Sequence, residues 1–124
     1  MVLQESGEMY LETILVLQKQ QGIVRSIDVA KKLGFARPTL SEQMKKFREE
    51  GLVSFNEENH ILLTEEGKKI AEKTYERHTV ITHFLTAIGV SPQTAEEDAC
   101  RIEHYISDET FACMKRSYEE AAEK

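Results

Sequence analysis

The sequence predicts a mainly α-helical chain whose helices flank a single two-stranded β-hairpin. Through most of the 124 residues, apolar side chains recur every three or four positions, which is the spacing of amphipathic helices. This spacing is broken between residues 52 and 63, where two short β-prone runs enclose the turn-forming segment Asn56–Asn59. Charged residues make up 31% of the chain, which fits a helix-rich soluble protein.

Three helices are expected before the hairpin. The first covers Met9–Gln20. The second follows Ser26, a residue type that commonly caps helix N-termini, and it ends at Gly34. The third has Pro38 in its first turn, where proline is well tolerated, and it ends at Gly51.

Three further helices are expected after the hairpin. Thr64 caps a long helix that continues to Ile88. The pair Ser91-Pro92 begins the next helix, which is expected to run through to Tyr105. Ser107 and the two acidic residues after it then cap a last helix that runs to the C-terminus.

Helix, short helix, tight turn, helix and hairpin is the element order of a winged helix-turn-helix. The segment Gly34–Arg37 is a turn of the right length between the second and third helices. We therefore predict a winged helix-turn-helix DNA-binding domain at residues 1–72 and a helical domain at residues 73–124.

Charge is unevenly distributed along the chain. The net charge is −6, but Arg25–Arg48 holds seven basic and two acidic residues, a local net charge of +5. The last part, His78–Lys124, holds four basic and nine acidic residues, a local net charge of −5. The basic segment suits the phosphates of duplex DNA, whereas the acidic segment suits cations.

The third helix is the expected reader of DNA, because in such motifs its N-terminal residues face the base edges in the major groove. Its hydroxyl, amide and carboxylate side chains can pair with bases, and neighbouring basic side chains can contact phosphates. The predicted DNA-binding residues are Arg25, Arg37, Pro38, Thr39, Ser41, Glu42, Gln43, Lys45 and Lys46. The hairpin tip, Glu57-Glu58, is acidic and is expected to contribute little. A protein-interaction module without DNA binding is the alternative.

Three potential metal ligands, Cys100, Glu103 and His104, are spaced i, i+3 and i+4, which places them on one face of the expected helix. Thiolate, carboxylate and imidazole together suit a first-row transition metal. Further ligands are needed from elsewhere, and the candidates are His78, Met9 and Glu12. Each also has an ordinary structural role open to it, as a solvated polar residue or, for Met9 and Cys100, as part of a core.

The cysteine content and the hydropathy of the sequence indicate in which cellular compartment the protein is expected. Cys100 and Cys113 do not form a disulfide framework, so a reducing cytoplasm is expected. No apolar run approaches the roughly 20 residues that a membrane span needs, and no export signal is evident. Neither a membrane nor a small-molecule substrate is expected as a partner.

Other classes of function compete with a metal-responsive regulator. Cys100 and His104 could be a nucleophile and its base, but they lie one turn apart on one helix, and no oxyanion element is evident. A metal-storage protein would not need the winged helix. A metal-independent regulator is the most serious competitor.

The chain resembles the iron- and manganese-dependent transcriptional repressors, the diphtheria-toxin-repressor and manganese-transport-regulator family. The resemblance covers nearly the whole chain, without the SH3-like domain that the iron branch often adds. The segments that carry it are Glu8–Ile14, Ala36–Glu42, Gly51–Val53, Leu63–Gly67, Arg77-His78, Ile88–Val90 and Asp98–His104.

The resemblance implies a primary metal site at Met9, Cys100, Glu103 and His104. It also implies a second site that includes His78. Glu12 matches a ligand of the manganese branch, and Glu96 is a possible addition, whereas Thr82 stands where the iron branch has a carboxylate. The chain therefore resembles a hybrid of the two branches. Sulfur ligands favour Fe(II), with Mn(II) as runner-up and Zn(II), Co(II) or Ni(II) expected to bind in vitro.

The resemblance further implies a homodimer that binds an inverted-repeat operator on double-stranded DNA near metal-uptake genes. The metal would act as co-repressor by fixing the spacing of the two DNA-reading helices. Dimerisation is expected through the helices Pro92–Tyr105 and Thr110–Ala121. Their apolar residues Ile102, Ile106, Phe111 and Met114 are interface candidates that could equally belong to the core.

Overall fold

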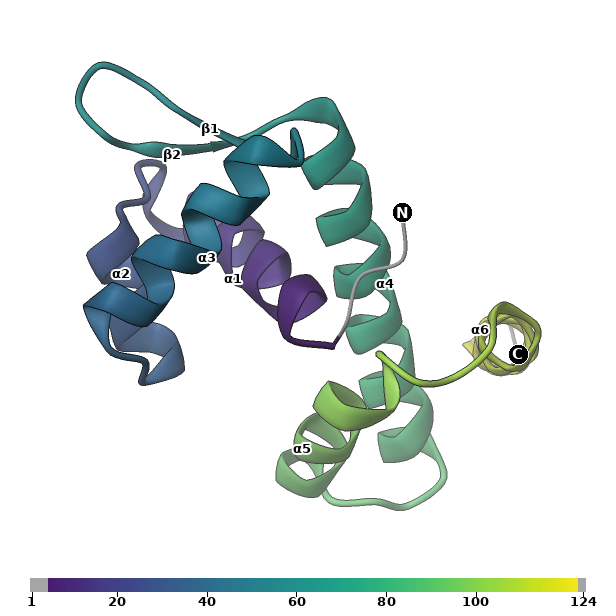
Figure 1. Cartoon of the computed structure of the whole chain (residues 1–124). Coiled ribbons are helices and arrows are strands. Elements are labelled where there is room, and N and C mark those ends of the chain that lie inside the picture. The colour runs from purple at the N-terminus through teal and green to yellow at the C-terminus, as the bar shows by residue number, and fades with distance from the viewer. Residues whose placement is uncertain (1–4, 123–124) are drawn as a thin grey trace. The chain divides into compact units, whose positions relative to one another are not determined.

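Within residues 5–122, which the computed structural model describes, the chain forms six helices and one two-stranded antiparallel sheet (Figure 1), so the predicted fold class is confirmed. The elements are α1 Glu5–Gln21, α2 Ser26–Leu33, α3 Arg37–Glu49, β1 Val53–Phe55, β2 Ile61–Leu63, α4 Glu65–Ala87, α5 Pro92–Ile102 and α6 Asp108–Ala122. The chain divides into two compact units, Met1–Glu72 and Lys73–Lys124. In the part that the structure describes, no helix is long and apolar enough to cross a membrane.

The core of the first unit gathers apolar side chains from α1, α2, α3 and the hairpin. Its largest fully buried members include Leu11, Ile14, Val29, Leu40, Met44, Phe47, Leu52, Val53 and Ile61. The ring of Tyr10 packs against those of Phe35 and Phe47, with centroids 5.6 and 6.0 Å apart, and burial raises the pKa of its phenol. The apolar face of α3 therefore lies in the core, and its polar face is left exposed.

The hairpin is fixed to the rest of the first unit by backbone hydrogen bonds. Val53 of β1 pairs with Leu63 of β2 in antiparallel register, and the N–H of Ile61 donates to the carbonyl of Val24 at 2.7 Å. Inside the turn, the Asn56 side chain accepts a hydrogen bond from the N–H of His60 at 2.9 Å. The bond between Ile61 and Val24 therefore holds the hairpin beside the segment that leads into α2.

The start of α4 packs against the two residues that precede β1, Gly51 and Leu52. The hydroxyl of Thr64 accepts a hydrogen bond from the N–H of Gly67 at 3.1 Å and donates to the carbonyl of Gly51 at 2.6 Å, so the predicted cap is confirmed. A Cβ atom on Gly67 would lie 2.0 Å from the carbonyl oxygen of Leu52, which is far inside van der Waals contact. Glycine is therefore required at this position for close packing.

One predicted cap is wrong. Ser26 is the first residue of α2, and the cap position is taken by Arg25, whose backbone is extended (φ −114°, ψ 160°). The N–H of Arg25 donates to the carboxylate of Asp28 at 2.9 Å. The acidic side chain in the first turn thus supplies the hydrogen bond that the prediction gave to the Ser26 hydroxyl.

The second unit consists of α4 from Lys73 onward, α5 and α6. Ser107 caps α6 as predicted, because its hydroxyl accepts a hydrogen bond from the N–H of Thr110 at 3.1 Å. Figure 1 shows α6 end-on beside α4. The two helices meet where Lys115 pairs with Glu76 at 3.4 Å and where the rings of His83 and Tyr118 lie 5.5 Å apart.

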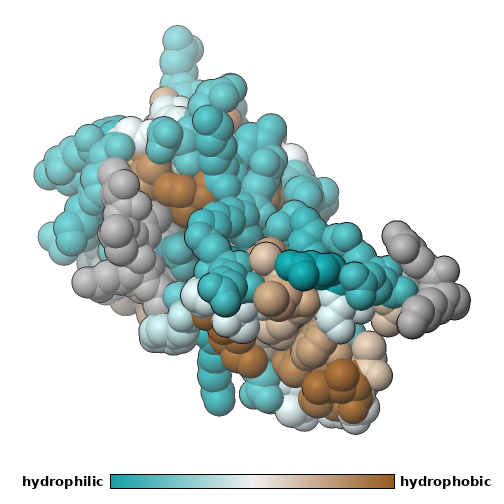
Figure 2. Space-filling view, turned by 90° about the vertical axis from the view of Figure 1, so that its right-hand side faces the viewer, coloured by the Kyte–Doolittle hydropathy of each residue, from teal (hydrophilic) through white to brown (hydrophobic). Residues whose placement is uncertain are grey.

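Part of the apolar surface of the second unit is exposed. In Figure 2, hydrophobic surface gathers in the lower part of the view. Ile88, just after α4, is 63% exposed. The predicted interface residues Ile102, Ile106, Phe111 and Met114 are all half-buried. Their role in a dimer stays a prediction.

Candidate metal centre and nucleic-acid interface

The predicted DNA-binding side chains lie mainly on the exposed face of α3. Arg37 is its first residue and Pro38 lies in its first turn, as predicted. On α3 the exposed members of this set are Arg37, Pro38, Thr39, Ser41, Glu42, Lys45 and Lys46, and Gln43 is half-buried. Arg25, at the N-cap of α2, is also exposed. This face therefore offers hydroxyl, amide and carboxylate groups close to several cations.

A groove of about 590 Å³ runs between α3, the start of α2 and the hairpin. Four cationic side chains line it, and they are Arg25, Arg37, Lys45 and Arg48. The only acidic group among its lining residues, within the part of the chain that the structure describes, is Glu58 of the hairpin. The groove is therefore an anion-attracting surface beside the start of the predicted recognition helix.

Arg48 is absent from the predicted DNA-binding residues. Its guanidinium lies 5.9 Å from the centre of the Phe55 ring, so it bridges α3 and the hairpin. The signal available in the sequence was its position three residues after Lys45, which places both on one helix face. Only the folded hairpin places Arg48 in the groove.

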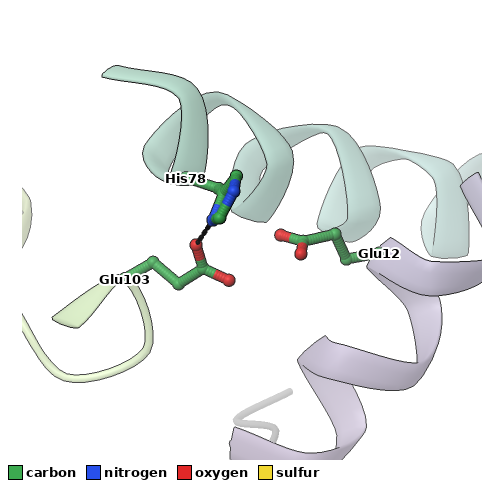
Figure 3. A group of neighbouring side chains, drawn as sticks. All are labelled: Glu12, His78 and Glu103. Carbon is green, nitrogen blue, oxygen red and sulfur yellow. Dashed lines mark hydrogen bonds and ion pairs between the residues drawn. The ribbon is translucent and has the colours of Figure 1, made fainter. Parts of the chain in front are cut away.

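The second unit brings together four of the predicted metal ligands. The imidazole of His78, on α4, lies 2.9 Å from the carboxylate of Glu103 through Nδ1 and Oε2 (Figure 3). The other carboxylate oxygen of Glu103 lies 3.3 Å from Nε2 of His104. The thiol of Cys100 lies 3.7 Å from Nδ1 of His78. Two imidazoles, a carboxylate and a thiol thus converge within one unit.

The predicted helical spacing of these ligands is only partly correct. Cys100 lies in the last turn of α5, but α5 ends at Ile102 and not at Tyr105. Glu103 is its C-cap residue and keeps a helical backbone, with φ −57° and ψ −24°. His104 lies in the following turn. The cluster therefore depends on how this turn is held, and not on helix geometry alone.

The remaining predicted ligands are Met9, Glu12 and Glu96. Met9 and Glu12 (labelled in Figure 3) are half-buried on α1 of the first unit. Glu96 is exposed on α5. The hydroxyl of Thr82 donates to the carbonyl of His78 at 2.7 Å, within α4. Thr82 thus makes an ordinary hydrogen bond within its own helix.

The donor set of the cluster fits a divalent cation. Glu103 is 2% exposed, and its two carboxylate oxygens face two different imidazoles. A buried carboxylate needs a cationic or hydrogen-bonding environment, and nitrogen, oxygen and sulfur donors together suit first-row transition metals.

The same cluster does not have the geometry of a catalytic triad. Both the thiol of Cys100 and the carboxylate of Glu103 approach the same nitrogen, Nδ1 of His78. In a triad, the base uses one ring nitrogen for the nucleophile and the other for the orienting acid. The arrangement therefore favours a ligand cluster over a nucleophile with its base.

Two family models together match nearly the whole chain. Residues 2–61 match the iron dependent repressor, N-terminal DNA binding domain. Residues 64–123 match the iron dependent repressor, metal binding and dimerisation domain.

Individual proteins that are similar to this chain include regulators of the same kind. The chain is 38% identical over 106 residues to "Transcriptional regulator MntR" of Escherichia coli O6:H1, covering 86% of this chain and 68% of the relative. It is 31% identical over 106 residues to "Diphtheria toxin repressor" of Corynebacterium glutamicum, covering 85% of this chain and 46% of the relative. A solved structure, "Manganese-dependent transcriptional repressor complex with manganese", matches with a TM-score of 0.83 at 27% identity. That match covers 91% of this chain and 52% of the other, so the chain spans about half the length of that solved protein.

Proposed function

The chain belongs to the iron-dependent repressor family, and on that premise we propose that it is a metal-activated, DNA-binding repressor of metal-homeostasis genes. Residues 1–72 would be the DNA-binding domain, and residues 73–124 the metal-binding and dimerisation domain. The observation that carries this proposal is the convergence of His78 and His104 on the buried carboxylate of Glu103. Two exposed cysteines without a disulfide suit a reducing cytoplasm.

The proposed primary metal site consists of Met9, Cys100, Glu103 and His104. His78 and Glu12 would form a second site beside it, with Glu96 as a possible further ligand. A bound divalent cation would neutralise the charge of the carboxylates. It would also join ligands from the two ends of the sequence. His78 and His104 would hold the Glu103 carboxylate in place before the ion arrives.

DNA recognition is assigned to the exposed face of α3. The side chains of Thr39, Ser41, Glu42 and Gln43 would contact base edges, and the first-turn Pro38 would hold the backbone that presents them. The cations Arg25, Arg37, Lys45 and Lys46 would contact phosphates. The partner is double-stranded DNA with an inverted-repeat operator, read by a homodimer whose half-sites lie about one helical turn apart.

Fe(II) is the proposed activating metal. The thioether of Met9 and the thiolate of Cys100 are softer donors than Mn(II) prefers, since Mn(II) favours oxygen. Mn(II) is the second candidate, because similar solved proteins are described as manganese-dependent or as manganese regulators. Anaerobic titration with each metal, compared at equal free-metal concentration, would decide between them.

Substitutions of single ligands test the proposed function. A randomised duplex library selected with protein and metal would supply the DNA probe, and fluorescence anisotropy would measure its affinity. Cys100→Ala and His104→Ala should abolish the metal dependence of DNA binding. Cys113→Ala, which removes the exposed cysteine of α6, is the matched control and should keep it. Unchanged metal dependence in either ligand variant would show that the assignment is wrong.

A further inference from the structure

Arg77 precedes His78 on α4, and its side chain is buried, with the residue only 8% exposed. The guanidinium donates to the main-chain carbonyl of Glu103 at 3.3 Å and to that of Ile106 at 2.9 Å. It also pairs with the carboxylate of Asp108, the first residue of α6. One side chain thus contacts both ends of the turn that joins α5 to α6.

The same guanidinium also contacts α6 through an aromatic ring. It lies 5.4 Å from the centre of the Phe111 ring, within the range of a cation–π interaction. Among the described residues, its four partners therefore all fall between residues 103 and 111.

This arrangement answers a local need of the backbone. The last carbonyls of a helix have no donors within that helix, and a buried carbonyl must find a hydrogen-bond partner. The planar guanidinium carries five N–H groups and can donate to several acceptors at once, which a lysine ammonium does less well. Arg77 therefore fixes the path of the chain where α5 ends early.

Stability alone is a weak explanation for this arginine. Burying a cation costs free energy, and the Nε–H of Arg77 is buried without a hydrogen-bond acceptor among the described residues. The compensating carboxylate of Asp108 is 80% exposed and also pairs with Lys73 at 3.4 Å. A buried polar group without a partner calls for an explanation.

We infer that Arg77 is a positioning residue for the metal ligand Glu103, which it links to the first turn of α6. Two consecutive residues of α4 contact Glu103. His78 contacts its side-chain carboxylate, and Arg77 contacts its main-chain carbonyl. The inference rests on the proposed function, because it takes Glu103 to be a ligand. Outer contacts of this kind commonly change metal affinity by about tenfold to a hundredfold when they are removed.

The test compares Arg77→Lys with Lys73→Met in the full chain. Arg77→Lys keeps the charge but loses the paired carbonyl contacts, and it should weaken Mn²⁺ binding, measured by calorimetry, by about tenfold or more. Lys73→Met removes the exposed partner of Asp108 and should change Mn²⁺ affinity by less than about twofold. The visible absorption bands of bound Co²⁺, which report ligand geometry, should shift in Arg77→Lys and not in Lys73→Met.

A second variant guards against loss of folding in Arg77→Lys. Asp108→Asn leaves both carbonyl contacts of Arg77 in place but removes its charged partner, and it should weaken Mn²⁺ binding by a smaller factor. If these Arg77 and Asp108 variants bind Mn²⁺ like the wild type and change only the melting temperature of the metal-free protein, the positioning role is overturned. If the wild type binds neither Fe²⁺ nor Mn²⁺, or Glu103→Gln binds the metal unchanged, the proposed metal site fails instead.

Discussion

The imidazole of His78 lies 2.9 Å from the carboxylate of Glu103, although 25 positions separate the two residues. The contact joins α4 to the end of α5 inside the second unit (Figure 3). Glu103 also faces His104, so its buried carboxylate is shared by two imidazoles.

Glu103→Gln should retain the shape of this cluster and lose its charge. We expect divalent-metal affinity to fall by at least about tenfold, because a neutral amide neither attracts nor ligates the ion as a carboxylate does. Calorimetry with Mn²⁺ and Fe²⁺ measures the loss. Glu97→Gln, an exposed α5 carboxylate, is the control and should bind like the wild type. Equal affinities in the two variants would remove Glu103 from the ligand set.

Cys100→Asp should shift the metal preference. A carboxylate is a harder donor than a thiolate, so affinity for Mn²⁺ should rise relative to Co²⁺ and Zn²⁺. Competition titrations with a chromophoric chelator give the three affinities. An unchanged affinity ratio would mean that the thiol of Cys100 is not a ligand.

Arg48→Met should weaken DNA binding in a salt-dependent, sequence-independent way. Arg48 lines the cationic groove of the first unit, so its loss should lower the slope of log affinity against log salt by about 1. Thr39→Ala, by contrast, should reduce discrimination between sequences and leave that slope unchanged. Arg116→Met, on α6, controls for the change in net charge. A salt slope identical to that of the wild type would exclude a phosphate contact for Arg48.

Gly67→Ala should destabilise the first unit. Its added methyl group would meet the backbone oxygen of Leu52 at 2.0 Å, and the backbone cannot yield as a flexible side chain can. We expect a loss of about 1–3 kcal/mol in the free energy of unfolding, as for other overpacked sites. Urea unfolding followed by circular dichroism measures it, with Lys69→Ala on the same helix as control. Equal midpoints in the two variants would contradict the close packing at Gly67.

Much of the fold was predictable because local signals dominate it. Thr64 and Ser107 were identified as caps from residue type and position, and both accept the expected backbone hydrogen bonds. Ser26 was misjudged because Asp28 competes for the same role and a carboxylate at the third helical position can reach back to the cap N–H. Such competition between neighbours cannot be resolved from residue type alone.

The candidate sites were predictable only in part. The spacing of Cys100, Glu103 and His104 predicted that the three form one ligand cluster. It also predicted that all three lie on one helix, but α5 ends at Ile102. The carbonyl contacts that Arg77 makes with residues 26 and 29 positions away depend on tertiary packing, and no local pattern signals them. Arg48 was missed for the same reason, since the hairpin completes its groove.

Activation of DNA binding by metal is the central claim, and an anaerobic titration of the metal-free protein tests it most directly. Affinity for a selected duplex would be measured by anisotropy as Fe²⁺ or Mn²⁺ is added, and again after a chelator removes the metal. The account predicts that affinity rises by about tenfold or more with metal and falls back with the chelator. Equal affinity with and without metal would contradict it and would favour a metal-independent regulator.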